Sequence, residues 1–108
     1  MRRVVRRGRN HRTPRLHISW LANDSDHPRV AIVVPRCGRT AVARNRIRRR
    51  LRELVRRRLC PRIGAVDVVI TARRDAYDSD FDEIAADLEQ WLGSSDDLQT
   101  GPKKWSPR

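Results

Sequence analysis

The sequence has few aromatic residues, few cysteines and no long apolar run, and each shortage excludes a class of protein. Phe, Trp and Tyr make up 5% of its 108 residues, and Cys37 and Cys60 are its two cysteines. No apolar stretch approaches the length of about 18 residues that spans a membrane, and the basic N-terminus lacks the apolar core of a secretion signal. We therefore expect a cytoplasmic protein with no membrane-spanning segment.

The cysteines and histidines are too scattered to indicate a metal site. The cysteines form no Cys-x-x-Cys pair, and His11, His17 and His27 follow no metal-ligand spacing. In a cytosolic protein such cysteines are reduced thiols. We expect the protein itself to bind no metal ion or other cofactor.

Positive charge is abundant, and it is unevenly distributed along the chain. Lys and Arg number 25 against 13 Asp and Glu, a formal net charge of +12. Residues 1–64 hold 20 basic and 3 acidic residues, a net charge of +17, whereas residues 65–108 hold 5 and 10, a net charge of −5. This asymmetry favours a polyanionic partner that is bound on one side of the molecule.

The arginines are densest between residues 41 and 59, where they surround a thin apolar stripe. The stripe has the spacing of one buried helix face and consists of Ile47, Leu51, Leu54, Val55 and Leu59. Arginine can hold a phosphate through two hydrogen bonds, so this helix is predicted to bind nucleic acid and to dock on a sheet. A solvated basic face, a calmodulin target or a membrane-surface helix are the alternatives, but a membrane-surface helix would have a broader apolar face with Trp or Phe.

Alternating and β-branched runs on either side of this helix predict strands. Residues 16–21 alternate between apolar and polar side chains, and residues 29–34 are predicted to form an antiparallel hairpin with them. Residues 65–72 are nearly continuous in Val and Ile and are predicted to be the central strand. Residues 1–15 are expected to be a basic arm or a truncated N-terminal helix followed by a loop.

Capping residues mark the ends of both helices. Thr40 is the expected N-cap of the basic helix, and Pro61 is its expected stop. Ser79 or Asp80 is expected to cap a second helix, with an acidic residue three positions on completing a capping box. Gly93 is the expected end of that helix.

The order of elements predicts a single α+β domain, an α/β sandwich in which two helices pack against a small mixed sheet. The domain is expected to span residues 1–93, with residues 94–108 as a flexible polar tail. Trp20 and Trp91 lie on apolar stripes and are expected in the core. The basic helix forms a crossover between two strands, a connection that is usually right-handed, although the sequence does not show its hand.

The acidic residues of the second helix raise the alternative of a metal-dependent nuclease. They are Asp80, Asp82, Glu83, Asp87 and Glu89. No paired histidine or second carboxylate motif accompanies them, and those nearest the helix start fit capping and compensation of the helix dipole. We predict no catalytic residue and no metal ligand. A DNA-reading helix-turn-helix is also disfavoured, because the basic helix follows a strand and a loop.

At the triplet Arg44-Asn45-Arg46 the sequence resembles the protein subunit of bacterial ribonuclease P. The resemblance lies in Ala-Val-x-Arg-Asn-Arg from residue 41, an apolar and two basic residues after it, Arg52-Glu53, the flanking strands and the acidic helix. It covers about residues 4–92. The resemblance implies an α/β sandwich with an unusual left-handed crossover that contains the basic helix.

The resemblance also implies partners and a function. Members of the family bind a large catalytic RNA, and the holoenzyme removes the 5′ leader of precursor tRNA by magnesium-dependent hydrolysis that the RNA performs. The residues that carry over to the RNA surface, or extend it, are Arg44, Asn45, Arg46, Arg48, Arg49, Arg50, Arg52 and Arg56. Their charge would screen the repulsion between two RNAs. The chain would belong to an endoribonuclease without being catalytic alone, and no protein partner is implied.

A leader-binding cleft on the sheet is the last implication of the resemblance. In the family a helix before the first strand supplies aromatic side chains that stack on single-stranded RNA. The leader-binding residues expected in this chain are Val5, His17, Ser19, Arg44, Asn45 and Arg52. Since Val5 and Ser19 are not aromatic, either arginine and backbone contacts hold the leader, or the natural chain begins upstream of Met1. A general RNA-binding module, such as a ribosomal protein or RNA chaperone, remains the alternative function.

Overall fold

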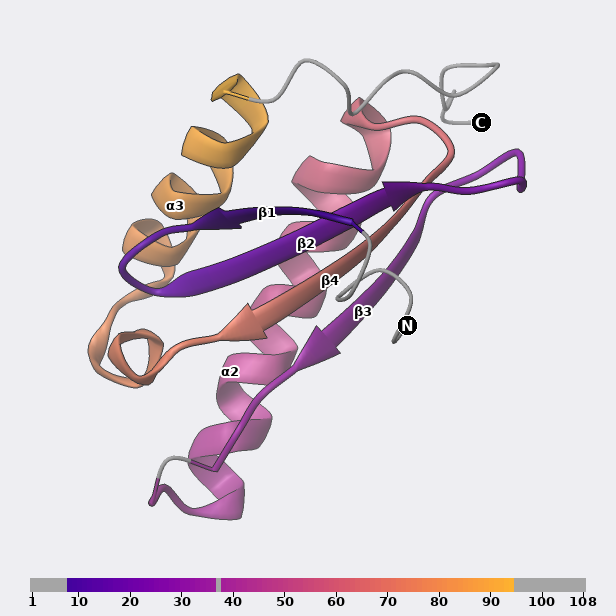
Figure 1. The fold of residues 1–108 in the computed structure, drawn as a ribbon. Helices are drawn as coiled ribbons and strands as arrows, with labels where there is room; N and C mark the ends of the chain where they lie inside the picture. Colours follow the sequence, from indigo (N-terminus) through magenta and orange to yellow (C-terminus); the bar gives the residue numbers. More distant parts are fainter. Residues whose placement is uncertain (1–7, 37, 95–108) are drawn as a thin grey trace.

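The computed structural model describes residues 8–36 and 38–94, which form a four-stranded mixed sheet with two long helices on one face (Figure 1). The strands are β1 (Arg9–Arg12), β2 (Leu16–Ala22), β3 (Arg29–Val33) and β4 (Val66–Ala72). The long helices are α2 (Ala41–Leu54) and α3 (Phe81–Ser94). The short helical turns are η1 (Val55–Leu59), η2 (Cys60–Arg62) and η3 (Arg74–Asp78). The predicted α+β class and mixed sheet are confirmed.

The predicted hairpin between residues 16–21 and 29–34 is wrong. The strand order is β1-β2-β4-β3, so β4 lies between the two strands, antiparallel to β2 and parallel to β3. The reason lies in β4, where Val68, Val69 and Ile70 are each at most 3% exposed. A strand that is apolar on both faces gains most from a central position in the sheet, and the predicted central position of β4 is confirmed. β4 therefore takes the place beside β2 that the hairpin would have given to β3.

The crossover from β3 through α2 to β4 is left-handed. In Figure 1 both strands run toward the lower left, β4 lies on the upper-left side of β3, and α2 lies behind the sheet. The hand agrees with the family resemblance and departs from the right-handed preference of most such units.

Residues 9–12 form an edge strand, which the sequence does not predict. The expected helix stub or flexible arm over residues 1–15 is therefore wrong for this part of it, because β1 pairs antiparallel with β2. The letters Arg-Asn-His-Arg have no apolar alternation, so the strand depends on its partner. One side-chain bond supports the pairing: the Ser19 hydroxyl donates to Asn10 Oδ1 at 2.7 Å.

The apolar stripe of α2 is buried against the sheet, as predicted. Ile47, Leu51 and Leu54 are each at most 2% exposed. Beyond Leu54 the helix widens into the π-helical turn η1, in which the Cys60 N–H donates to the Val55 carbonyl, so the regular helix ends five residues earlier than predicted. Leu59 is nevertheless fully buried, so the stripe continues through the widened turn.

The predicted caps of both helices are confirmed. Thr40 Oγ1 accepts a hydrogen bond from the Ala43 N–H at 3.1 Å. At the start of α3, Asp80 and Glu83 form a reciprocal capping box, with bonds of 2.9 and 3.0 Å. The α3 helix runs through the expected stop at Gly93 and ends one residue later, within the ordinary spread of helix ends.

The core between sheet and helices closes around two tryptophans. Trp20 is 6% exposed and Trp91 is fully buried, which confirms that both belong to the core. Their rings meet edge to face, with centroids 5.4 Å apart and planes inclined at 61°. Trp20 comes from β2 and Trp91 from α3, so this contact fixes the helix to the sheet.

Arg15 joins the turn after β1 to the start of α3. Its guanidinium donates to Ser79 Oγ at 2.6 Å, Glu83 Oε2 at 2.7 Å and Asp87 Oδ1 at 3.2 Å, and its backbone N–H donates to Asp87 Oδ2 at 3.1 Å. Asp87 is 5% exposed, so its charge depends on this partner.

Replacing Arg15 by alanine is expected to lower the free energy of unfolding by about 1–3 kcal/mol, because Asp87 would keep a desolvated charge without its guanidinium. Arg62→Ala is the matched control, since Arg62 pairs with the more exposed Glu89 at 2.6 Å and such pairs contribute about 0–1 kcal/mol. Urea unfolding of both variants measures the difference. Equal losses would contradict the structural role given to Arg15.

Candidate nucleic-acid interface

A row of three exposed arginines forms the outer surface of α2. Arg46, Arg49 and Arg52 are exposed, and within residues 8–36 and 38–94 none of them makes a hydrogen bond or an ion pair. Three-residue spacing places them on successive turns of the same side of the helix. Asn45 is exposed beside them and offers both a donor and an acceptor. We call Asn45, Arg46, Arg49 and Arg52 the outer row.

Two further arginines of α2 are tied to the scaffold on its flanks. Arg44 is half-buried and donates through Nε to the Val34 carbonyl at 3.3 Å. Arg50, on the other flank, is also half-buried and donates through Nη1 to the Ser79 carbonyl at 3.4 Å. The triplet at residues 44–46 is therefore divided, because Arg44 faces the end of β3 whereas its two neighbours are exposed.

Intrahelical partners offset part of the remaining charge. Glu53 accepts from Arg56 at 3.0 Å and from Arg57 at 2.5 Å. Arg48 reaches Asn45 Oδ1 at 3.5 Å, a long contact. Two of the three arginines of η1 thus have an acidic partner, whereas Arg46, Arg49 and Arg52 of α2 have none among the described residues.

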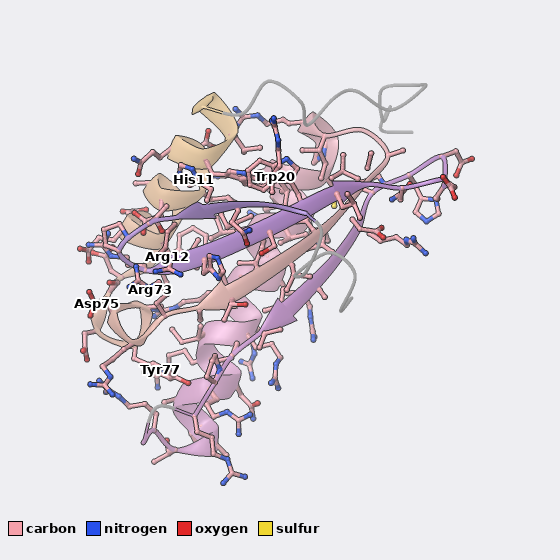
Figure 2. All side chains as sticks on the ribbon, in the orientation of Figure 1. His11, Arg12, Trp20, Arg73, Asp75 and Tyr77 are labelled. Carbon is pink, nitrogen blue, oxygen red and sulfur yellow. The ribbon has the colours of Figure 1, made fainter. Side chains whose placement is uncertain are left out.

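The sheet face opposite the helices carries a second set of polar and basic side chains. Strand register places Arg12, His17, Thr71 and Val33 in one row across the sheet. The next row contains Asn10, Ser19, Val69 and Ala31. Figure 2 shows Arg12 beside Arg73, the residue that follows β4.

The expected leader-binding residues fall in different places. His17 lies half-buried on this sheet face, whereas Ser19 is 2% exposed and its hydroxyl is bonded to Asn10. Val5 lies outside the described residues. Arg12 joins His17 on the face, and sequence reasoning missed it because residues 9–12 show no strand pattern.

The environment of His17 disfavours its protonated form. Burial lowers the pKa of His17 below its ordinary value of 6.5, and the positive charges of Arg12 and Arg73 lower it further. At neutral pH the imidazole is therefore uncharged and can accept as well as donate a hydrogen bond.

The lowered pKa of His17 predicts a pH-dependent stability. An unfolded chain takes up the proton near pH 6.5 while the folded chain resists it, so the contribution is complete above pH 6.5 and decreases as the pH falls toward the folded pKa. Glutamine does not titrate, so His17→Gln is expected to lose less stability than the parent chain between pH 7.5 and pH 5. Parallel urea unfolding curves at these pH values measure the difference, and identical losses would contradict it.

Four of the five acidic residues at the start of α3 and along it have structural partners. Glu83 and Asp87 hold Arg15, Asp80 caps the helix and Glu89 pairs with Arg62. In the part of the chain that the structure describes, no group of three His, Cys, Asp or Glu side chains is placed to hold a metal ion. The same residues include no helix long and apolar enough to cross a membrane.

Cys60 is a free, half-buried thiol at the start of η2. Burial raises the pKa of this thiol, which keeps it protonated and unreactive at neutral pH. Cys37 and Trp105 lie outside the described residues.

Comparisons with known proteins agree on one family. The family model described as ribonuclease P matches residues 1–95. The ribonuclease P protein component of Brucella suis is 34% identical over 91 residues, covering 81% of this chain and 62% of the relative. The ribonuclease P protein component of a Nocardioides species is 35% identical over 94 residues, covering 84% of this chain and 80% of the relative. The chain thus spans less than two thirds of the Brucella relative.

The fold leads to the same family. The structure of the Staphylococcus aureus RNase P protein superposes with a TM-score of 0.80 at 27% identity, covering 91% of this chain and 90% of that one. An RNase P protein from Thermotoga maritima shares the fold with a TM-score of 0.76 and 24% identity.

Proposed function

Because this chain belongs to the ribonuclease P protein family, we propose that it is the protein subunit of a cytoplasmic ribonuclease P and assists removal of the 5′ leader from precursor tRNA. Its partners in this proposal are the catalytic RNA and the precursor tRNA. The RNA performs the phosphodiester hydrolysis and holds the magnesium that the reaction requires. The protein contributes binding and charge.

The observation that carries the proposal is the outer row. Arg46, Arg49 and Arg52 have no partner in the described ranges, while the stripe behind them is buried in the core. Like charges held at this spacing repel one another, and a phosphate backbone relieves that repulsion when it binds. The catalytic RNA is therefore assigned to this side of α2, with Arg48, Arg50 and Arg56 extending the contact.

The leader is assigned to the sheet face beside β1. His17 is uncharged and next to Arg12, so one side chain can hydrogen-bond a base or a sugar while the other binds a phosphate. Arg44, Asn45 and Arg52 lie on α2, so these expected leader-binding residues extend the leader site from the sheet face onto the RNA-binding helix. Ser19 takes a supporting part, since its hydroxyl positions Asn10.

A comparison of precursor tRNA with mature tRNA tests the assignment of the leader to the sheet face. The complete holoenzyme is compared with the RNA subunit alone for binding to precursor tRNA with an eight-nucleotide leader and to mature tRNA. The protein is expected to raise affinity for the precursor more than for the mature form, and Arg12→Ala is expected to reduce that difference. Arg29→Ala, which removes an equal charge paired with Asp67, is the control. An equal gain for both RNAs would contradict the leader site.

A further inference from the structure

A cleft of about 350 Å³ lies between the first half of α2 and the chain that leads from η3 into α3. Its volume is at the lower end of the range of ligand sites, about 300–1,000 Å³. Arg46 and Arg50 line the helix side, and Tyr77, Asp78 and Asp80 line the other. Figure 2 shows Tyr77, a residue of η3, beside the lower half of α2.

The two sides of the cleft have opposite charge. Arg46 is exposed and unpaired within the described residues, so it supplies a free cation at the rim. Across the cleft, Asp78 and Asp80 are exposed carboxylates, of which Asp78 is already paired with Arg39. Asp80 uses Oδ1 for the cap of α3, which leaves its second oxygen free to accept a hydrogen bond. Between the two charged sides, Ala43 and the buried Ile47 contribute an apolar wall.

The wall formed by η3 is held in place without a ligand. The Tyr77 hydroxyl donates to the Pro35 carbonyl at 2.5 Å. The Arg39 guanidinium lies 5.2 Å from the centre of the Tyr77 ring and donates to both oxygens of Asp78 at 3.1 Å. Arg50 ties the helix to the Ser79 carbonyl. A cleft fixed in this way loses little conformational freedom when it is occupied.

A duplex backbone does not match this charge pattern, because the carboxylates would repel its phosphates and pairing already occupies the Watson–Crick N–H groups of its bases. An unpaired nucleotide has the same two ends as the cleft, an anionic phosphate and a base edge with donors. Guanine fits best among the bases, since its adjacent N1–H and N2–H groups offer two donors. One can reach the second oxygen of Asp80, and the other a remaining lone pair of Asp78, whose oxygens also accept from Arg39.

We propose that this cleft binds one unpaired guanosine of an RNA, with its phosphate on Arg46, its base against Tyr77 and the apolar wall, and its N–H donors on Asp78 and Asp80. The proposal rests on the proposed function, because the cleft opens beside the outer row and needs RNA bound there. The cleft would select a particular nucleotide, whereas the outer row beside it binds phosphates through charge alone.

Three short RNA hairpins with the same paired stem test the proposal. The stem of the first is fully paired, that of the second carries a single unpaired guanosine, and that of the third carries a single unpaired uridine. The full chain is expected to bind the guanosine hairpin about tenfold more tightly than the paired one, the range that one good base contact supplies. The uridine hairpin is expected to fall close to the paired one. Equal affinities for guanosine and uridine would overturn the role of the carboxylates.

Asp78→Asn is expected to reduce the preference for the guanosine hairpin to less than threefold. The matched control is Asp75→Asn, which removes the same charge from an exposed η3 residue that does not line the cleft. A preference that falls equally in both variants would overturn the proposal. If the parent chain binds the guanosine and paired hairpins alike, the cleft is wrong and the RNA-binding helix stands. If it binds no hairpin, the proposed function fails as well.

Discussion

Replacing Arg49 and Arg52 together by alanine is expected to weaken binding of the catalytic RNA by tenfold or more and to flatten its salt dependence. If the basic surface neutralises about 6 phosphates, the slope of log K against log[salt] is near −4 to −5. Each arginine that binds a phosphate contributes close to one unit, so the double variant should have a slope lower in magnitude by about two. Binding titrations over a range of salt concentrations measure both quantities.

The control for this variant removes the same two charges from positions outside the outer row. Arg29 and Arg62 are each already paired, with Asp67 and Glu89, so a phosphate gains less from them. The Arg29→Ala, Arg62→Ala double variant is expected to keep most of the slope. Equal losses in the two double variants would show that net charge, and not the outer row, determines affinity.

Leu51→Ala is expected to lower the free energy of unfolding by about 2–5 kcal/mol without a specific effect on RNA contacts. Leu51 is 1% exposed at the centre of the α2 stripe, and its truncation leaves a cavity between helix and sheet. In a domain of this size each kcal/mol lowers the melting temperature by roughly 4–8 °C.

Val42→Ala is the matched control, because Val42 lies on the same helix and is 69% exposed. Its unfolding free energy should change by no more than about 0.5 kcal/mol. Thermal and urea unfolding compare the two variants. A melting temperature unchanged by Leu51→Ala would contradict the assignment of the buried stripe and, with it, the direction in which the arginines point.

Features that depend on neighbouring residues in the sequence could be predicted, and features that depend on strand pairing could not. The α2 stripe, the Thr40 cap, the capping box at Asp80 and the buried tryptophans follow from local periodicity and side-chain chemistry, and each is confirmed. The pairing of β2 with β4 instead of β3 is a long-range competition, which local alternation does not decide.

The candidate site likewise has features that could be predicted from the sequence and features that could not. The sequence indicates which side of α2 is polar, but it does not show that Arg44 and Arg50 are tied to carbonyl groups while Arg46 has no partner among the described residues. Arg12 reaches the sheet face only because β1 pairs with β2, and the cleft beside Tyr77 exists only because η3 packs along α2. Such juxtapositions join residues far apart in the chain and leave no local pattern.

Cleavage of precursor tRNA at low magnesium concentration, with the catalytic RNA of the same organism, tests whether this chain is the protein subunit of a ribonuclease P. The reaction is run with both components, with the RNA alone and with the protein alone. We expect efficient cleavage with both components and none with the protein alone. Cleavage by the protein alone, or no stimulation of the RNA by the protein, would contradict it.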